Sequence, residues 1–106
     1  MAERVFIFYR LKPDIEREQF EQPPRDIEAP LAARSPAIRR YVLTRLEGVL
    51  EGKAPAPFDY VETLDVTTLE EYRNGVTDAE VDAFIKEWEE DVAEYVLVHG
   101  RIVSEA

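Results

Sequence analysis

The chain has 106 residues, 45% of them hydrophobic and 10% aromatic, and its formal net charge is -10 at pH 7. This length predicts a single domain over residues 1–106, and the apolar content excludes disorder as the default. The acidity argues against nucleic-acid or membrane-surface binding, because both need clustered Lys and Arg. With no cysteine and one histidine, disulfides and a zinc site of several imidazoles within one protomer are excluded. We expect no metal, no cofactor and a cytoplasmic location.

The first strand is predicted over residues 4–11, because β-branched and aromatic residues dominate this stretch. Both of its faces are apolar, which is typical of a strand that is covered on both sides. One face carries Val5, Ile7, Tyr9 and Leu11, and the other carries Phe6 and Phe8. This strand is the first indication that a partner covers the sheet.

A helix is predicted to follow, with Asp14 as its N-cap. Pro23-Pro24 lies inside this helix and predicts a break or a kink, because proline cannot donate a backbone hydrogen bond and disfavours helix before it. Ser35-Pro36 is expected to end the segment.

Two strands and two helices are predicted next, and then a last strand. Thr68 with Glu71 and Thr77 with Glu80 fit capping boxes, which predict two helix starts. In the second strand, strict alternation places Ile38 and Tyr41 on opposite faces. The predicted ranges are 38–47 and 58–66 for the strands, 69–74 and 78–92 for the helices, and 95–103 for the last strand. The order β-α-β-β-α-β predicts a ferredoxin-like α+β fold, with a four-stranded antiparallel sheet and its helices on one face.

The sheet face opposite the helices is also predicted to be apolar, at least along the first strand. An exposed apolar face of this size usually marks an interaction site. Two such sheets that pack face to face around a twofold axis remove this apolar face from water. We therefore predict a homodimer in which two protomers form an α+β barrel; a monomer that exposes this face is the alternative.

Several stretches, spread over nearly the whole chain, carry a family resemblance. They are Tyr9-Arg10-Leu11-Lys12-Pro13, Arg25-Asp26, the strand from Tyr41 to Gly48, Pro57-Phe58-Asp59-Tyr60-Val61-Glu62 and Val66-Thr67-Thr68-Leu69. The chain resembles the RedY-like family of the dimeric α+β barrel superfamily. The resemblance implies paired ferredoxin-like protomers and a link to the biosynthesis of aromatic natural products such as prodiginines. This superfamily includes cofactor-free monooxygenases, lactone isomerases, polyketide cyclases and haem enzymes. The fold alone therefore does not determine which reaction is catalysed.

Glu62 is the first candidate catalytic residue. It lies two residues after Tyr60 on one strand, so both side chains point to the same face, among apolar neighbours. Burial raises the pKa of a carboxyl group, which makes it a usable acid or base near neutral pH. We expect Glu62 to move a proton on an aromatic or enolisable substrate while Tyr60 orients it. The alternative is an ion pair with Arg10, Arg40 or Arg45 on a neighbouring strand.

His99, in the last strand, is the second candidate proton carrier, because imidazole titrates near neutral pH. The alternative is that His99 is a structural residue that makes a hydrogen bond within the strand. Ligation of haem iron by His99 is a further, weaker alternative. Tyr9, Tyr41 and Tyr60 are candidates for binding a planar substrate, although tyrosines suit a dimer core equally well. Arg45 could meet a carboxylate or phenolate, or could simply keep the surface soluble.

The leading interpretation is a cofactor-independent enzyme that acts on a small apolar, aromatic or polyketide-like metabolite. The reaction would be proton transfer, condensation or cyclisation. One alternative is a non-catalytic module that binds the same kind of metabolite. Another is a purely structural dimer, which a solid core without a cavity would favour.

Overall fold

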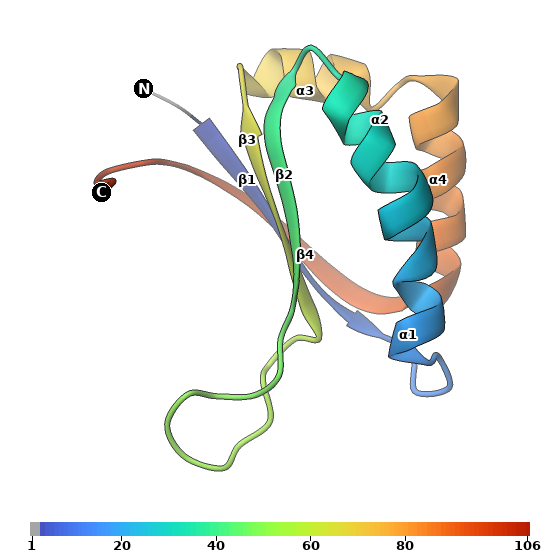
Figure 1. The fold of residues 1–106 in the computed structure, drawn as a ribbon, viewed down its shortest axis with the longest axis vertical. Coiled ribbons are helices and arrows are strands. Elements are labelled where there is room, and N and C mark those ends of the chain that lie inside the picture. The colour runs from blue at the N-terminus through green and yellow to red at the C-terminus, as the bar shows by residue number, and fades with distance from the viewer. Residues whose placement is uncertain (1–2) are drawn as a thin grey trace.

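The computed structural model describes residues 3–106. Its strands are β1 (Glu3–Leu11), β2 (Ile38–Arg45), β3 (Tyr60–Val66) and β4 (Val92–Arg101). Its helices are α1 (Arg17–Phe20), the π-helical turn η1 (Pro24–Glu28), α2 (Ala29–Arg34), α3 (Leu69–Gly75) and α4 (Ala79–Asp91). Figure 1 shows the helices on one face of the sheet.

The sheet has the strand order β2-β3-β1-β4, and each neighbouring pair is antiparallel. This arrangement confirms the predicted ferredoxin-like α+β fold. The two central strands are β3 and β1, where Tyr9 is paired with Tyr60 on one side and with Tyr95 on the other. Side chains paired in this way lie on the same face of the sheet.

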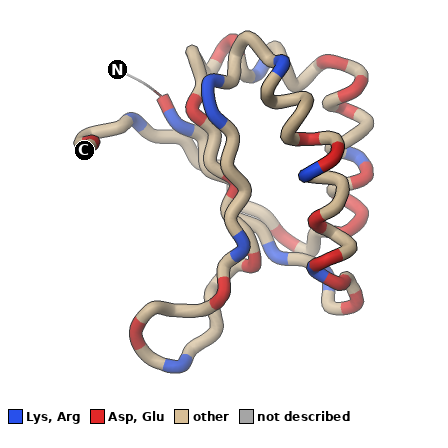
Figure 2. Tube along the Cα trace, in the orientation of Figure 1, with Lys and Arg blue, Asp and Glu red and all other residues tan. Residues whose placement is uncertain are grey.

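The two faces of the sheet differ in what covers them. Every second residue of β3 is buried under the helices, beginning at Tyr60 and ending at Val66. The opposite face carries Phe6 and Phe8, whose ring centroids are 6.4 Å apart. Figure 2 shows that the central part of the strands is largely free of charged residues, while the helices carry both signs. The second face is therefore apolar and is not covered by the described part of the chain.

In β2 the strict alternation predicted from the sequence is wrong, because the strand contains a bulge. Ile38 pairs with Val66, but Arg40 pairs with Asp65, so one extra residue is accommodated between them. A bulge of this kind changes which side chains point to a given face. It turns Ile38 to the helix-covered face, which Tyr41 also shares.

The helical segment after β1 differs from its prediction at its start and in its middle. Glu16 rather than Asp14 precedes the first turn, and its side chain makes no capping bond. At Pro23-Pro24 the chain stays helical instead of breaking, and it widens into a π turn in which the Ala29 N–H donates to the Pro24 carbonyl oxygen. Pro24 has no N–H to donate to the preceding turn, and such a gap in the bonding pattern favours a local π turn.

The two later helices begin close to where their capping signals lie. At α3 the Thr68 hydroxyl oxygen accepts from the Glu71 N–H at 3.0 Å, which confirms the first predicted cap. At α4 the cap is Asp78, which accepts from the Glu80 N–H at 2.9 Å, so the predicted cap at Thr77 is one residue too early. Among residues 3–106, no helix is both long enough and apolar enough to cross a membrane.

Candidate active site

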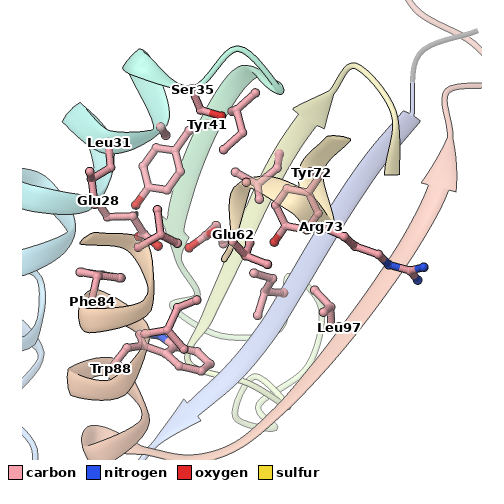
Figure 3. A pocket seen from close by; sticks show the side chains of 18 of the residues that line it. Glu28, Leu31, Ser35, Tyr41, Glu62, Tyr72, Arg73, Phe84, Trp88 and Leu97 are labelled. Carbon is pink, nitrogen blue, oxygen red and sulfur yellow. Dashed lines mark hydrogen bonds between the residues drawn. The ribbon is translucent and has the colours of Figure 1, made fainter. Parts of the chain in front are cut away.

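A cavity of about 330 Å³ lies between the helix-covered face of the sheet and the helices. One wall is the apolar stripe of α4, where Val81, Phe84, Ile85 and Trp88 follow helical spacing. The opposite wall comes from β1, β2 and β3, and α2 and α3 close the sides. Figure 3 shows the side chains of these elements converging on one space. The protomer therefore encloses a mostly apolar chamber of a size that suits a small organic molecule.

Two carboxyl groups meet inside this cavity. Glu62 projects from β3 and is 5% exposed, and Glu28 is the last residue of the π turn. Their side chains point toward one another (Figure 3) and share a hydrogen bond. The hydroxyl group of Tyr41 donates to Oε1 of Glu28 at 2.5 Å. A buried carboxyl pair is thus held between a strand and a helical segment.

The environment of the pair separates the roles of its two members. Burial raises the pKa of Glu62 well above its ordinary value, and the charge of Glu28 and the hydrogen bond to it raise this pKa further. Burial also raises the pKa of Glu28, but the hydrogen bonds from Tyr41 and Glu62 act in the opposite direction. The Tyr41 hydroxyl donates to Glu28 and not to Glu62, and this bond favours the charged form of Glu28 over that of Glu62. Two adjacent carboxyl groups with one proton between them can both donate and accept a proton.

Three tyrosines surround the carboxyl pair, of which Tyr9 is buried and Tyr41 and Tyr72 are partly buried. Burial and the two carboxyl groups raise the pKa of Tyr72 to about 12, and burial also raises the pKa values of Tyr41 and Tyr9. All three are therefore neutral phenols that can donate hydrogen bonds. The hydroxyl group of Tyr9 is buried and has no hydrogen-bond partner among the described residues.

A second cavity, of about 280 Å³, lies beside the first and contains a different cluster. Its centre is Glu21, which is 7% exposed. The carboxylate of Glu21 accepts from the Tyr60 hydroxyl at 2.6 Å, from Nε of Arg45 at 2.7 Å and from Arg25 at 3.2 Å. The hydrogen bonds and charge of Arg45 lower the pKa of Glu21 despite its burial. Tyr41 lines both cavities.

The residues predicted for the site are thus divided among three places. Glu62 and Tyr41 line the first cavity, whereas Arg45 and Tyr60 line the second. Tyr9 lies beneath them and stacks on Tyr60, with ring centroids 5.3 Å apart. The Tyr60 hydroxyl donates to Glu21 in the second cavity, so a role of Tyr60 in orienting the substrate of Glu62 stays a prediction.

The ion pair considered as an alternative for Glu62 is also absent. Arg10 pairs with Glu94 at 2.7 Å, and Arg45 pairs with Glu21. Among the salt bridges of residues 3–106, none involves Glu62 or Arg40. The reason is geometric, because Glu62 lies on the helix-covered face, where Glu28 is the group that reaches it.

His99 lies apart from the carboxyl pair. It is exposed on the edge strand β4, paired with Val5, and it does not line either cavity. The single described protomer therefore does not bring together the two proton carriers that the sequence suggested. A role of His99 in proton transfer stays a prediction.

Sequence reasoning missed Glu28 and Tyr72, which complete the site. Glu28 reaches the cavity from the π turn, and π turns inside helices occur frequently at functional sites. The Pro23-Pro24 pair is the available signal, because it predicts a break or a kink at this point of the helix. Trp88 both lines the cavity and packs edge-on against Tyr9, with ring centroids 5.0 Å apart. Across residues 3–106, no three His, Asp or Glu side chains are grouped so that they could hold a metal ion.

The fold and the sequence together identify the family. The family model of the REDY-like protein HapK matches residues 3–103. The chain belongs to this family. The match covers both cavities and every strand, so the REDY-like assignment applies to the whole described domain. No protein of curated function matches the chain in sequence.

Solved structures share this REDY-like fold at low sequence identity. HapK from Hahella chejuensis is 17% identical, with a TM-score of 0.74 over 98% of this chain and 96% of that one. A hydroxynitrile lyase from Passiflora edulis is 17% identical, with a TM-score of 0.78 over 99% and 95%. A dimeric ferredoxin-like protein of unknown function from Thermobifida fusca is 20% identical, with a TM-score of 0.74 over 96% and 92%. These likenesses establish the fold, and at least one protein with this fold is a lyase.

Proposed function

We propose that this REDY-like protein is a cofactor-independent enzyme that moves protons on a small apolar carbonyl compound of aromatic or polyketide type. The observation that carries this proposal is the Glu62–Glu28 carboxyl pair inside an apolar cavity of about 330 Å³. A solid core would have favoured a purely structural dimer, and the cavity argues against that alternative. The hydroxynitrile lyase of similar fold adds support for an enzyme.

The carboxyl pair can carry out a balanced enolisation. The carboxylate of Glu28 takes a proton from the carbon next to the substrate carbonyl, while Glu62 gives its own proton to the carbonyl oxygen. The substrate becomes an enol, Glu28 becomes the protonated partner and Glu62 becomes the carboxylate. The pair has one negative charge before and after the step, so no additional charge is buried. An enol formed in this way is the nucleophile that condensation or cyclisation requires.

We also propose that the protein works as a homodimer that covers the outer face of the sheet. This face carries the stacked rings of Phe6 and Phe8, and the ring centroid of Phe58 lies 5.7 Å from that of Phe8. On β4, Val96 and Val98 are 43% and 40% exposed. The same face of a second protomer, related by a twofold axis, can bury an apolar face of this kind. The Thermobifida fusca protein of the same fold is described as dimeric.

Proton exchange in D₂O tests the catalytic proposal. The probe is 4-phenyl-2-butanone, whose hydrogens next to the carbonyl exchange slowly by themselves and whose deuteration can be followed by NMR. We expect the wild-type protein to accelerate exchange and Glu62→Gln to lose most of this acceleration, because an amide cannot donate and recover the proton. Trp88, the single tryptophan, lies in the cavity wall and reports binding by its fluorescence.

The matched control is Glu87→Gln on the exposed face of α4, which should exchange like wild type. Equal exchange in wild type and Glu62→Gln, with the probe bound to both, would instead support a non-catalytic binding module. Native mass spectrometry of the protein from its own host tests the remaining part. We expect a dimer that carries a small organic adduct, and a monomer would contradict the dimer proposal.

A further inference from the structure

The charges around the first cavity are unbalanced. Glu28 brings a carboxylate into it, and Glu62 brings a second carboxyl group. Among the described residues that line the cavity, Arg73 is the single Lys or Arg, and its guanidinium group points away from the space (Figure 3). The cavity therefore has a negative charge in its interior and no opposing cation.

The second cavity shows that this imbalance is a property of one site and not of the protein. There Glu21 faces Arg45 and Arg25, which neutralise it. Arg45, which the sequence suggested as a partner for an anionic ligand, is occupied by this carboxylate through two hydrogen bonds of 2.7 and 2.8 Å. Among residues 3–106 no comparable partner reaches Glu28, whose hydrogen-bond donors are Tyr41 and Glu62.

The carboxyl pair still has acceptor positions for a ligand. A carboxylate offers about four lone-pair sites, and the two known donors use only part of the capacity of Glu28. The surrounding walls supply aromatic rings, namely Tyr41, Tyr72, Phe84 and Trp88. Aromatic rings attract cations and carboxylates bind them, and both attractions are stronger in a site that excludes water. The carboxyl pair and the aromatic walls therefore both favour a cationic ligand.

We propose that this cavity selects apolar molecules that carry a protonated amine, and that it rejects apolar carboxylates and phosphates. The ammonium group would lie at the Glu28–Glu62 pair, with the apolar body against the α4 stripe. This inference rests on the proposed function in one respect, because it uses the same cavity and names its substrate class. An ammonium group beside the pair would also stabilise the partial negative charge that develops on the carbonyl oxygen as the enol forms, so amino ketones fit both proposals.

The two glutamates should contribute differently to this selectivity. Glu28 holds the charge, so Glu28→Gln removes the attraction for a cation while its amide oxygen can still accept from Tyr41. Glu62 holds the proton, so Glu62→Gln replaces one neutral donor with another and leaves the charge in place. Tyr9 from β1, Tyr41 from β2 and Tyr72 from α3 are neutral phenols beside the pair. Glu89 of α4 and Arg73 of α3 also line the cavity. The selectivity is thus assigned to Glu28.

Three probes of nearly equal size test the inference, namely 4-phenylbutylamine, 4-phenylbutanol and 4-phenylbutyrate. At neutral pH they are a cation, a neutral molecule and an anion. Binding is measured by calorimetry and by Trp88 fluorescence. We expect the amine to bind wild type about tenfold more tightly than the alcohol, and the butyrate to bind at least about tenfold more weakly. In Glu62→Gln the preference for the amine should persist, and in Glu28→Gln it should fall to less than about threefold.

The neutral probe separates failure of this inference from failure of the proposed function. If the alcohol binds and the amine has no advantage, the cavity is a ligand site without charge selection and the inference is overturned. Equal loss of amine binding in Glu28→Gln and Glu87→Gln, which lies on the exposed face of α4, would overturn the assignment to Glu28. If none of the three probes binds, both proposals fail. Urea unfolding of each variant verifies that the binding data come from folded protein.

Discussion

Two buried glutamates of this protein, Glu21 and Glu62, lie where the same helical segment packs on the same strand, yet their pKa values are shifted in opposite directions. Glu21 and Glu28 lie seven residues apart on the segment after β1, and they face Tyr60 and Glu62, which lie two residues apart on β3. Arg45 lowers the pKa of Glu21, whereas burial and a second carboxyl group raise the pKa of Glu62.

This comparison teaches that burial alone does not decide what a carboxyl group can do. Glu21 and Glu62 are 7% and 5% exposed, so the protein covers both side chains. The difference lies in the facing group on the neighbouring elements, an arginine in one case and a glutamate in the other. A carboxylate paired with arginine stabilises the fold, and a carboxyl pair with one proton is available for chemistry.

The largest expected effect is loss of stability in Glu21→Ala. This change leaves Arg45 and the Tyr60 hydroxyl without their acceptor, and it should reduce the free energy of unfolding by about 2–3 kcal/mol. Urea denaturation followed by Trp88 fluorescence measures it. Glu87→Ala on the exposed face of α4 is the control and should change stability by less than about 0.5 kcal/mol. A loss at Glu21 no larger than this control would remove the structural role assigned to the cluster.

A smaller effect, with a characteristic sign, is expected for Glu62→Gln as a function of pH. The folded-state pKa of Glu62 is raised, so its contribution to stability is complete below the unfolded pKa of about 4.3 and is lost as pH rises through the folded pKa. Wild type should therefore lose stability relative to Glu62→Gln as pH rises above the unfolded pKa toward the raised folded pKa. Unfolding curves at several pH values measure the difference.

The same measurement on Glu21→Gln should give the opposite sign. The folded-state pKa of Glu21 is lowered, so its contribution is present above the unfolded pKa and is lost as pH falls through the folded pKa. The advantage of wild type over Glu21→Gln should therefore shrink in acid. If both variants changed in the same direction with pH, the contrast between the two sites would be wrong.

The smallest effect is expected for His99→Ala. His99 is exposed on β4 and lines neither cavity, so its removal should change stability by less than about 0.5 kcal/mol and leave probe binding unchanged. Deuterium exchange of 4-phenyl-2-butanone is the sensitive measurement. A slower exchange in His99→Ala would restore His99 as a proton carrier and would place it near the cavity of the assembled protein.

Most of the fold was predictable, because its signals are local. Strands dominated by β-branched and aromatic residues and the apolar stripe of α4 indicated their elements directly. The errors lie where the backbone departs from a regular period. The bulge between Ile38 and Arg40 changed the facing of Ile38, and a π turn at Pro24–Glu28 is found where a break or a kink was expected. Neither irregularity follows from a regular alternation of side chains.

The candidate site was predictable only in part, for the same reason. A period of two places Tyr60 and Glu62 on one face of β3, and the apolar neighbours of Glu62 imply its burial. Which side chain then meets Glu62 depends on helical residues that are 34 positions away in the chain, as the numbers of Glu28 and Glu62 show. Because the π turn packs on the sheet, Glu28 contacts Glu62 (Figure 3), and the arginines of the neighbouring strands do not. Local pattern therefore specified the elements and the buried carboxyl group, and tertiary packing selected its partner, because a pKa depends on neighbours in space.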